Sequence, residues 1–396
     1  MARPLRLDAQ IPTPASASTK IQLAILATAM IDALGGPPEF HERFTFPLIT
    51  GMQPNNNFNL PPGVWTDDTS MTLCLAQSLS LATRSGNDGT RGNFDEREQL
   101  EAYKAWYRKG KLSAIGRCFD IGTTIRRALH IYEQCSPDDE IGIVLERIAA
   151  QLGGESSSGN GSLMRVLPIG LAYWRDEGLA KEHARRSSRT THPNALCQEA
   201  CEVWTAAIVR VMQASTMGSR ENYTKLDLVK FFAEFAYTDS KLQKALSLPS
   251  SAPPVPTTGE QEEYYRKHHP ILLLITKTSE HYSNREGFSK PIPRTEELPS
   301  TGYVLHTLVA ALYCFLATET FEEGAIMAVN LGSDADTVGA VYAGLAGCWY
   351  GGKEKAGVDD LFWTNRTRGW RAGLVQHQLV EEVANGLVVF STKLGE

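Results

Sequence analysis

The sequence predicts an all-α fold, a compact bundle of helices that forms a single domain. Apolar residues recur at helical spacing over most of the 396 residues, and no segment alternates apolar and polar residues as a half-buried strand does. Hydrophobic residues make up 42% of the chain and charged residues 21%, which is sufficient for a packed core. Length alone allows one large domain or two medium ones, and the continuous helical pattern favours one.

Nine segments show the helical spacing most clearly. Each places apolar residues at positions i, i+3 and i+4, so that one face of the helix is apolar. In chain order they are residues 69–83, 123–133, 139–152, 160–176, 194–214, 225–246, 301–317, 321–330 and 336–350. We also expect a buried helix from Ile21 to Gly36, because this apolar stretch contains Asp32 and is shorter than the roughly 20 residues of a membrane span.

Two segments have compositions that do not form a core. Residues 1–19 lack the apolar stretch of a signal peptide, and we predict that they form a disordered tail. Residues 247–262 are rich in Pro, Ser and Thr, which predicts a disordered insertion. Helical spacing resumes after the insertion, so residues 20–390 are predicted to form one domain around it.

Charge and cysteine content exclude some classes of protein. A net charge of -6 at pH 7 argues against a protein that binds nucleic acid by neutralising phosphates. Cys197 and Cys201 could form half of a metal site, but no His or Cys follows at zinc-site spacing. We therefore expect reduced thiols in an intracellular protein, cytoplasmic or nuclear. We also expect a monomer with no membrane partner.

The first acidic cluster is Thr66-Asp67-Asp68-Thr69, which directly precedes an apolar helical segment. One Asp or Thr at this place would cap the helix, because its oxygen accepts from the free N–H groups. Two adjacent carboxylates repel each other, and a divalent cation is a common way to make such a pair favourable. The cluster therefore indicates either a helix cap or a metal site.

The second acidic cluster is Gly332-Ser333-Asp334-Ala335-Asp336-Thr337, again at the start of a helix. That helix carries a stripe of small residues, Gly339, Ala343 and Gly347, against which another helix can pack closely. Carboxylate and hydroxyl oxygens suit Mg²⁺, Mn²⁺ or Ca²⁺ rather than zinc or copper. The four carboxylates of the two clusters could serve two ions about 4 Å apart.

Five motifs together resemble a known family, the ADP-ribosylglycohydrolases, which include dinitrogenase-reductase-activating glycohydrolase and the ADP-ribosyl-acceptor hydrolases. The resemblance extends from about residue 20 to about residue 385, apart from residues 215–265. In chain order the motifs are Ile31-Asp32-Ala33-Leu34-Gly35 with Glu39-Phe40 behind it, WTDDTSMTLCLAQSL at 65–79, SGNGSLMRVLPIGL at 158–171, Thr191-His192, and NLGSDADTVGAVYAGLAGCWYG at 330–351.

The resemblance implies an all-α fold with a binuclear metal cleft that holds two Mg²⁺ ions, for which Mn²⁺ can substitute. Glu39 matches the family's catalytic glutamate, and Asp68 is our second predicted catalytic residue. By matched position, the predicted metal ligands are Thr66, Asp67, Asp68, Asp334, Asp336 and Thr337.

The resemblance also implies which residues bind the substrate. The loop Ser158, Gly159, Asn160, Gly161 and Ser162 matches the segment that binds the diphosphate and distal ribose, and His192 matches a histidine of the ADP-ribose cleft. We add Ser333 and Tyr303, the first because it could contact the ligand and the second because its ring could stack on a base or ribose. Arg165 is interpreted as structural.

The chain departs from the family pattern at three positions. Ser333 replaces a glycine, Ile31 replaces the leading glycine of its motif, and His306 stands where an acidic residue is common. Serine has a Cβ where glycine allows any φ, so the turn before Asp334 is expected to be altered or to gain a ligand contact. Ile31 puts the close backbone approach at that motif in doubt.

The predicted function is Mg²⁺-dependent hydrolysis of the glycosidic bond between ADP-ribose and an acceptor, which could be a protein side chain, poly(ADP-ribose) or a small conjugate. Two alternatives stay open. One is a catalytically lapsed relative that binds ADP-ribose or has a structural role, as crystallin-like members do. The other is a metal-dependent phosphohydrolase that uses the same acidic clusters.

Overall fold

A computed structural model describes residues 7–82, 94–216, 222–257 and 259–395. Within these residues the chain forms seventeen α-helices and one short 3-10 helix, and extended pairing is limited to isolated bridges. The all-α prediction is therefore confirmed. The α-helices are α1 (Ala17–Gly35), α2 (Asp67–Ala82), α3 (Glu96–Lys109), α4 (Thr123–Glu133), α5 (Ile141–Leu152), α6 (Leu167–Ala172), α7 (Glu177–Arg189), α8 (Ala195–Ser215), α9 (Lys225–Glu234), α10 (Ser240–Leu246), α11 (Gln261–His268), α12 (Pro270–His281), α13 (Val304–Ala317), α14 (Phe321–Val329), α15 (Ala335–Tyr350), α16 (Asn365–Gly373) and α17 (His377–Lys393).

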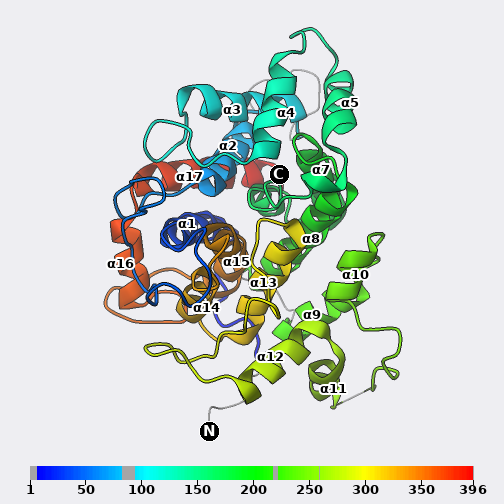
Figure 1. The fold of residues 1–396 in the computed structure, drawn as a ribbon, viewed down its shortest axis with the longest axis vertical. Helices are drawn as coiled ribbons and strands as arrows, with labels where there is room; N and C mark the ends of the chain where they lie inside the picture. Colours follow the sequence, from blue (N-terminus) through cyan, green and yellow to red (C-terminus); the bar gives the residue numbers. More distant parts are fainter. Residues whose placement is uncertain (1–6, 83–93, 217–221, 258, 396) are drawn as a thin grey trace.

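Helices α1 and α15 pack against each other along their length and form the centre of the bundle (Figure 1). Helices α2, α14, α16 and α17 also contact α1, and α8 and α13 contact α15. In the described part of the chain, α1 is the one helix long and apolar enough to cross a membrane. Most of α1 is buried by its neighbours, so it is the core helix that the sequence predicts.

The small residues of α15 let α1 approach closely, as the sequence predicts. A Cβ on Gly347 would lie 2.7 Å from the Cα of Ala24, and one on Gly339 would lie 2.8 Å from a side-chain carbon of Ile31. The isoleucine that replaces the family glycine at position 31 is therefore accommodated by the missing side chain of Gly339. This packing also fixes the start of α15, because a Cβ on Gly35 would lie 2.5 Å from the Cα of Asp336.

Several predicted helices differ from those observed. The predicted helix 225–246 is divided into α9 and α10, because Glu199 accepts hydrogen bonds from the backbone of Thr238 and Asp239, and Asp239 caps α10. In the predicted segment 160–176 only α6 is helical. Six observed helices were not predicted, and most of them bury few residues, which makes their apolar spacing weak: α3, α7, α11, α12, α16 and α17.

The two segments predicted to be disordered have defined contacts where the structure describes them. Residues 7–16 run beside residues 215–216 and 222–226, with backbone hydrogen bonds from Ile11 to Tyr223 and from Ala15 to Ser215, and α1 begins at Ala17. Residues 1–6 lie outside the described residues. The 247–262 segment is mostly irregular, but Tyr264 donates to the carbonyl of Pro253, so the described part of the insertion is held in place.

Candidate functional site

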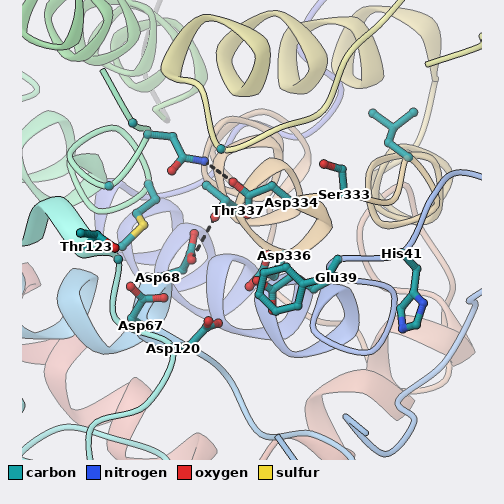
Figure 2. A pocket seen from close by; sticks show the side chains of 18 of the residues that line it. Glu39, His41, Asp67, Asp68, Asp120, Thr123, Ser333, Asp334, Asp336 and Thr337 are labelled. Carbon is teal, nitrogen blue, oxygen red and sulfur yellow. Dashed lines mark hydrogen bonds between the residues drawn. The ribbon is translucent and has the colours of Figure 1, made fainter. Parts of the chain in front are cut away.

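A cavity of about 950 Å³ opens at the N-terminal ends of α2 and α15. This volume is near the upper end of the roughly 300–1,000 Å³ that is typical of small-molecule sites. Figure 2 shows the acidic side chains converging inside it. The lining consists of residues 39–44, 67–68, 120–125, 159–161 and 294–296, with Met164, His192, Gly302, Leu331, Ser333, Asp334, Asp336 and Thr337.

The first acidic cluster is held in place by Asp32, a fully buried carboxylate of α1. Its two oxygens accept hydrogen bonds from the backbone N–H and the hydroxyl of both Thr66 and Thr69, at 2.5–3.2 Å. Because Thr66 donates its hydroxyl proton to Asp32, the lone pairs of that oxygen are free to face the carboxylates. Asp67 and Asp68 begin α2, where the helix dipole favours negative charge.

The second acidic cluster is linked both to the first and to the loop at 159–161. Asp334 immediately precedes α15, and Asp336 and Thr337 lie in its first turn. Thr337 donates to Oδ2 of Asp68 at 3.1 Å, and the amide of Asn160 donates to Oδ2 of Asp334 at 2.6 Å (Figure 2). The fold thus brings together all six predicted metal ligands from two segments that are about 270 residues apart.

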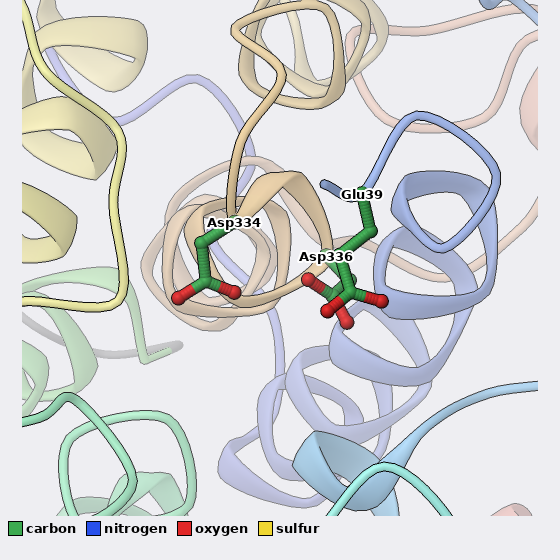
Figure 3. A group of neighbouring side chains, drawn as sticks. All are labelled: Glu39, Asp334 and Asp336. Carbon is green, nitrogen blue, oxygen red and sulfur yellow. The ribbon is translucent and has the colours of Figure 1, made fainter. Parts of the chain in front are cut away.

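Glu39 joins these clusters from the turn that follows α1. Its side chain is buried, and its carbonyl accepts a hydrogen bond from Asn57. One oxygen each of Glu39, Asp334 and Asp336 lie within 4.8 Å of one another (Figure 3). The three residues form a group that could hold a metal ion.

The carboxyl groups destabilise one another unless a cation is bound. Burial, followed by the charge of neighbouring carboxylates, raises the pKa of Asp67, Asp68 and Asp336 well above the ordinary value, and that of Glu39 to about 11. Oε2 of Glu39 and Oδ1 of Asp68 and Asp336 are buried without a hydrogen-bond partner. A hard divalent cation would compensate the charge and coordinate these oxygens, so the residues fit Mg²⁺ or Mn²⁺.

Asp120 is a further acidic residue in the cavity, and the sequence analysis missed it. It lies just before α4 with a left-handed backbone (φ 60°), and its carboxyl interacts with that of Glu39. Burial and the charge of Asp334 raise its pKa to about 8. The sequence signal for this residue was its place two residues before Gly122, which precedes a predicted helix. The signal was weak because no second acidic residue stands beside Asp120.

The predicted diphosphate loop lies partly in the cavity. Gly159, Asn160 and Gly161 line it, whereas Ser158 and Ser162 do not. Ser162 is buried and bonds to the hydroxyl of Ser188 instead, because its side chain points into the core. The hydroxyl of Ser162 is therefore not available to a ligand, contrary to our prediction.

His192 lines the cavity beside this loop and is neutral. A Cβ on Gly161 would lie 2.8 Å from its ring, so glycine is required for the loop to pass. Burial, followed by the charge of Arg165, lowers the pKa of His192 to about 3. Arg165 is fully buried and donates to the carbonyl of Gly161 and the hydroxyl of Thr191, which confirms its structural role.

Tyr303 does not line the cavity. It packs edge-on against His306 at 5.0 Å and forms an isolated bridge with Gly159. Its predicted stacking on a ligand is therefore not supported by the geometry. Ser333 does line the cavity, in the turn before Asp334.

Ser333 has a left-handed backbone (φ 61°), which disfavours every residue with a Cβ. We expect Ser333→Gly to raise the free energy of unfolding by about 0.5–1 kcal/mol. We also expect a higher KM, since the variant lacks the hydroxyl in the cavity. Thermal unfolding and steady-state kinetics measure both. Gln376→Gly, at a similar φ of 56° outside the cavity, is the matched control and should change stability alone.

Comparison with known proteins decides the family. The model of the ADP-ribosylglycohydrolase family matches residues 13–392. The chain belongs to the ADP-ribosylglycohydrolase family. A solved structure described as an ADP-ribosylglycohydrolase-related protein complex is similar to this family member with a TM-score of 0.59 and 31% identity, covering 95% of this chain and 99% of the other.

Several curated relatives of this family member are similar to it over most of their length. ADP-ribosylarginine hydrolase Tri1 of Serratia proteamaculans is 27% identical, covering 93% of this chain and 78% of the relative. The ADP-ribosyl-[dinitrogen reductase] glycohydrolase of Rhodospirillum rubrum is 24% identical, covering 85% of this chain and 86% of the relative. Human ADP-ribosylhydrolase ARH3 is 24% identical, covering 72% of this chain and 71% of the relative.

Proposed function

We propose that the protein hydrolyses the glycosidic bond between ADP-ribose and an acceptor, with two Mg²⁺ ions in the cavity. The observation that carries this proposal is the convergence of six carboxylates and the Thr337 hydroxyl at one end of a ligand-sized cavity, with the Thr66 hydroxyl buried behind them, in a family of ADP-ribosyl hydrolases. The ions would be held by Glu39 and by the six predicted ligands, Thr66, Asp67, Asp68, Asp334, Asp336 and Thr337. When bound, they would supply Lewis acidity and lower the pKa of water.

The other lining residues suit the ADP part of the substrate. Backbone N–H groups are free at the start of α4, where Gly122 makes no side-chain cap. This helix start and the loop of Gly159 and Gly161 both line the cavity. Such N–H groups bind phosphate oxygens. His192 is neutral and so supplies a ring nitrogen without adding charge.

Glu39 and Asp120 suit proton transfer during bond cleavage. Glycoside hydrolysis passes through an oxocarbenium-like state, in which the leaving group gains a proton and water loses one. The two carboxyls lie in the same cavity and interact with each other, and such a pair can hold one proton while one member is ionised. We propose that this pair carries out both transfers.

The test is release of ADP-ribose from purified substrates, with ADP-ribosylarginine as the first acceptor because of the Serratia relative. We expect turnover with Mg²⁺, none in EDTA, and recovery when Mg²⁺ is restored. Glu39→Gln should lose about 100- to 10,000-fold in kcat while still binding ADP-ribose in calorimetry. Full turnover in EDTA would overturn the proposal.

Two other outcomes correspond to the alternatives. Hydrolysis of phosphate monoesters that is indifferent to Glu39→Gln would identify a phosphohydrolase. ADP-ribose binding without turnover of any ADP-ribosyl substrate would identify a lapsed relative. The intact set of carboxylates argues against the second, because loss of function would remove the selection that maintains them.

A further inference from the structure

The cavity continues past the carboxylates on the side of His41, away from Thr123. In Figure 2, Thr123 lies on one side of the carboxylates, and His41 lies on the other. The lobe around His41 is lined by residues 40–44 and 294–296, which we term the acceptor lobe. If ADP-ribose lies along the loop at 159–161, the bond to be cut lies at the carboxylates, and the acceptor must extend into this lobe.

Two phenylalanines of the acceptor lobe are half exposed or more, and the edge contact of Phe58 at 6.1 Å covers Phe40 in part. Phe40 is 65% exposed and Phe44 is 50% exposed, and they are the only aromatic residues among the large, exposed hydrophobic side chains in the described part of the chain. Both also have left-handed backbones, with φ of 64° and 70°. A bulky residue in this conformation is strained, and such strain persists mainly at functional sites.

The strained backbone is held by contacts with the turn before Asp334. The N–H of Phe40 donates to the carbonyl of Ser333 at 2.7 Å, and the N–H of Ser333 donates to the carbonyl of His41 at 2.8 Å. The backbone that carries the phenylalanines is thus hydrogen-bonded to the turn that precedes Asp334.

Arg43 joins the two sides of the acceptor lobe. It is buried and donates to the carbonyls of Leu331, Pro293 and Leu298 at 2.7–2.8 Å. The bonds to Pro293 and Leu298 tie both ends of the 294–296 segment to the segment that carries the phenylalanines. The lobe is therefore pre-organised, which lowers the entropy cost of binding a partner.

The charge of the acceptor lobe favours a polypeptide over a nucleic acid. Its exposed charged side chains are Glu42, Glu296 and Arg294, and the buried guanidinium of Arg43 lies behind them. This surface lacks the excess of cationic side chains that binds a phosphate backbone. Exposed aromatic faces beside carboxylates suit apolar and cationic side chains.

We propose that the acceptor lobe binds the polypeptide around an ADP-ribosylated residue, with Phe40 and Phe44 as specificity-determining contacts. The inference rests on the proposed function and deepens it. The enzyme should therefore cleave a modified residue within a peptide more efficiently than the same modified residue as a free amino acid.

The experiment compares kcat/KM for ADP-ribosylarginine as the free amino acid and within a ten-residue peptide with flanking lysines. We expect Phe40→Ala and Phe44→Ala each to lower the peptide-to-amino-acid ratio about tenfold. Phe44→Trp should retain the ratio, because it keeps an aromatic face. Val358→Ala, which removes a similarly exposed side chain (52%) outside the cavity, should change neither substrate.

A separate measurement tests the strain. Phe44→Gly should unfold at a higher temperature than the wild type while losing the preference for the peptide, because glycine accepts the left-handed backbone. An unchanged ratio in both alanine variants would overturn the inference, and so would a preference for an ADP-ribosylated oligonucleotide end. Failure of the wild type to cleave either arginine substrate, and their serine-linked equivalents, would instead refute the proposed function.

Discussion

Replacing Asp336 with asparagine should lower the release of ADP-ribose by about 1,000-fold or more, and at the same time stabilise the metal-free protein. Both effects have one cause. Asp336 faces Glu39, Asp68 and Asp334, and one of its oxygens is buried without a hydrogen-bond partner. Removing its charge removes a predicted metal ligand, and it also removes repulsion within the cluster.

Thermal unfolding with and without Mg²⁺ measures the second effect. The wild type should gain stability on adding Mg²⁺, since the cation binds the folded state, and Asp336→Asn should lose most of this gain. Glu199→Gln is the matched control, because Glu199 is a buried carboxylate whose oxygens accept from Thr238 and Asp239. It should destabilise the protein with or without Mg²⁺. Lower metal-free stability of Asp336→Asn would contradict repulsion within the cluster.

Asp32→Asn should have the second largest effect, on both stability and Mg²⁺ binding, although Asp32 does not line the cavity. Its oxygens accept from the backbone N–H groups of Thr66 and Thr69, and an amide NH₂ would face one of these donors. We expect a loss of about 2–4 kcal/mol in the free energy of unfolding. Misplacement of Thr66, a predicted ligand, should weaken Mg²⁺ binding by about 10- to 100-fold.

Calorimetry with Mn²⁺ and denaturant unfolding separate the positioning role of Asp32 from a purely structural one. Asp227→Asn is the matched control, because Asp227 also accepts from the N–H and hydroxyl of one threonine, Thr224, at the start of α9. It should lower stability modestly and leave Mn²⁺ affinity unchanged. Unchanged Mn²⁺ affinity in Asp32→Asn would show that Asp32 acts on stability alone.

The helices that build the site were predictable because their sequence pattern is local. The segments 69–83 and 336–350 carry enough apolar residues at helical spacing to fix α2 and α15, and the acidic residues stand next to their first turns. The stripe of Gly339 and Gly347 also predicted close packing, because a missing side chain leaves room whichever helix fills it. That this helix is α1 was not predictable.

Features that depend on distant contacts were not predictable. Asp120 has no acidic neighbour in the sequence, and it belongs to the site only because its loop folds over Glu39. Ser162 was predicted to bind the ligand from its place in a motif, but the side-chain direction depends on Ser188. The order of residues 7–16 likewise comes from Ser215, Tyr223 and Leu226, which are remote in sequence.

The acidic clusters themselves show the same division. Sequence alone determined that Asp67 and Asp68, and Asp334 and Asp336, each form a pair of repelling carboxylates at the start of a helix, because adjacent charges and helix caps are local properties. Only the tertiary structure decided that the two pairs meet each other and Glu39 in a single cavity. The approach of α1 and α15 joins them, and that approach depends on packing between residues some 300 positions apart.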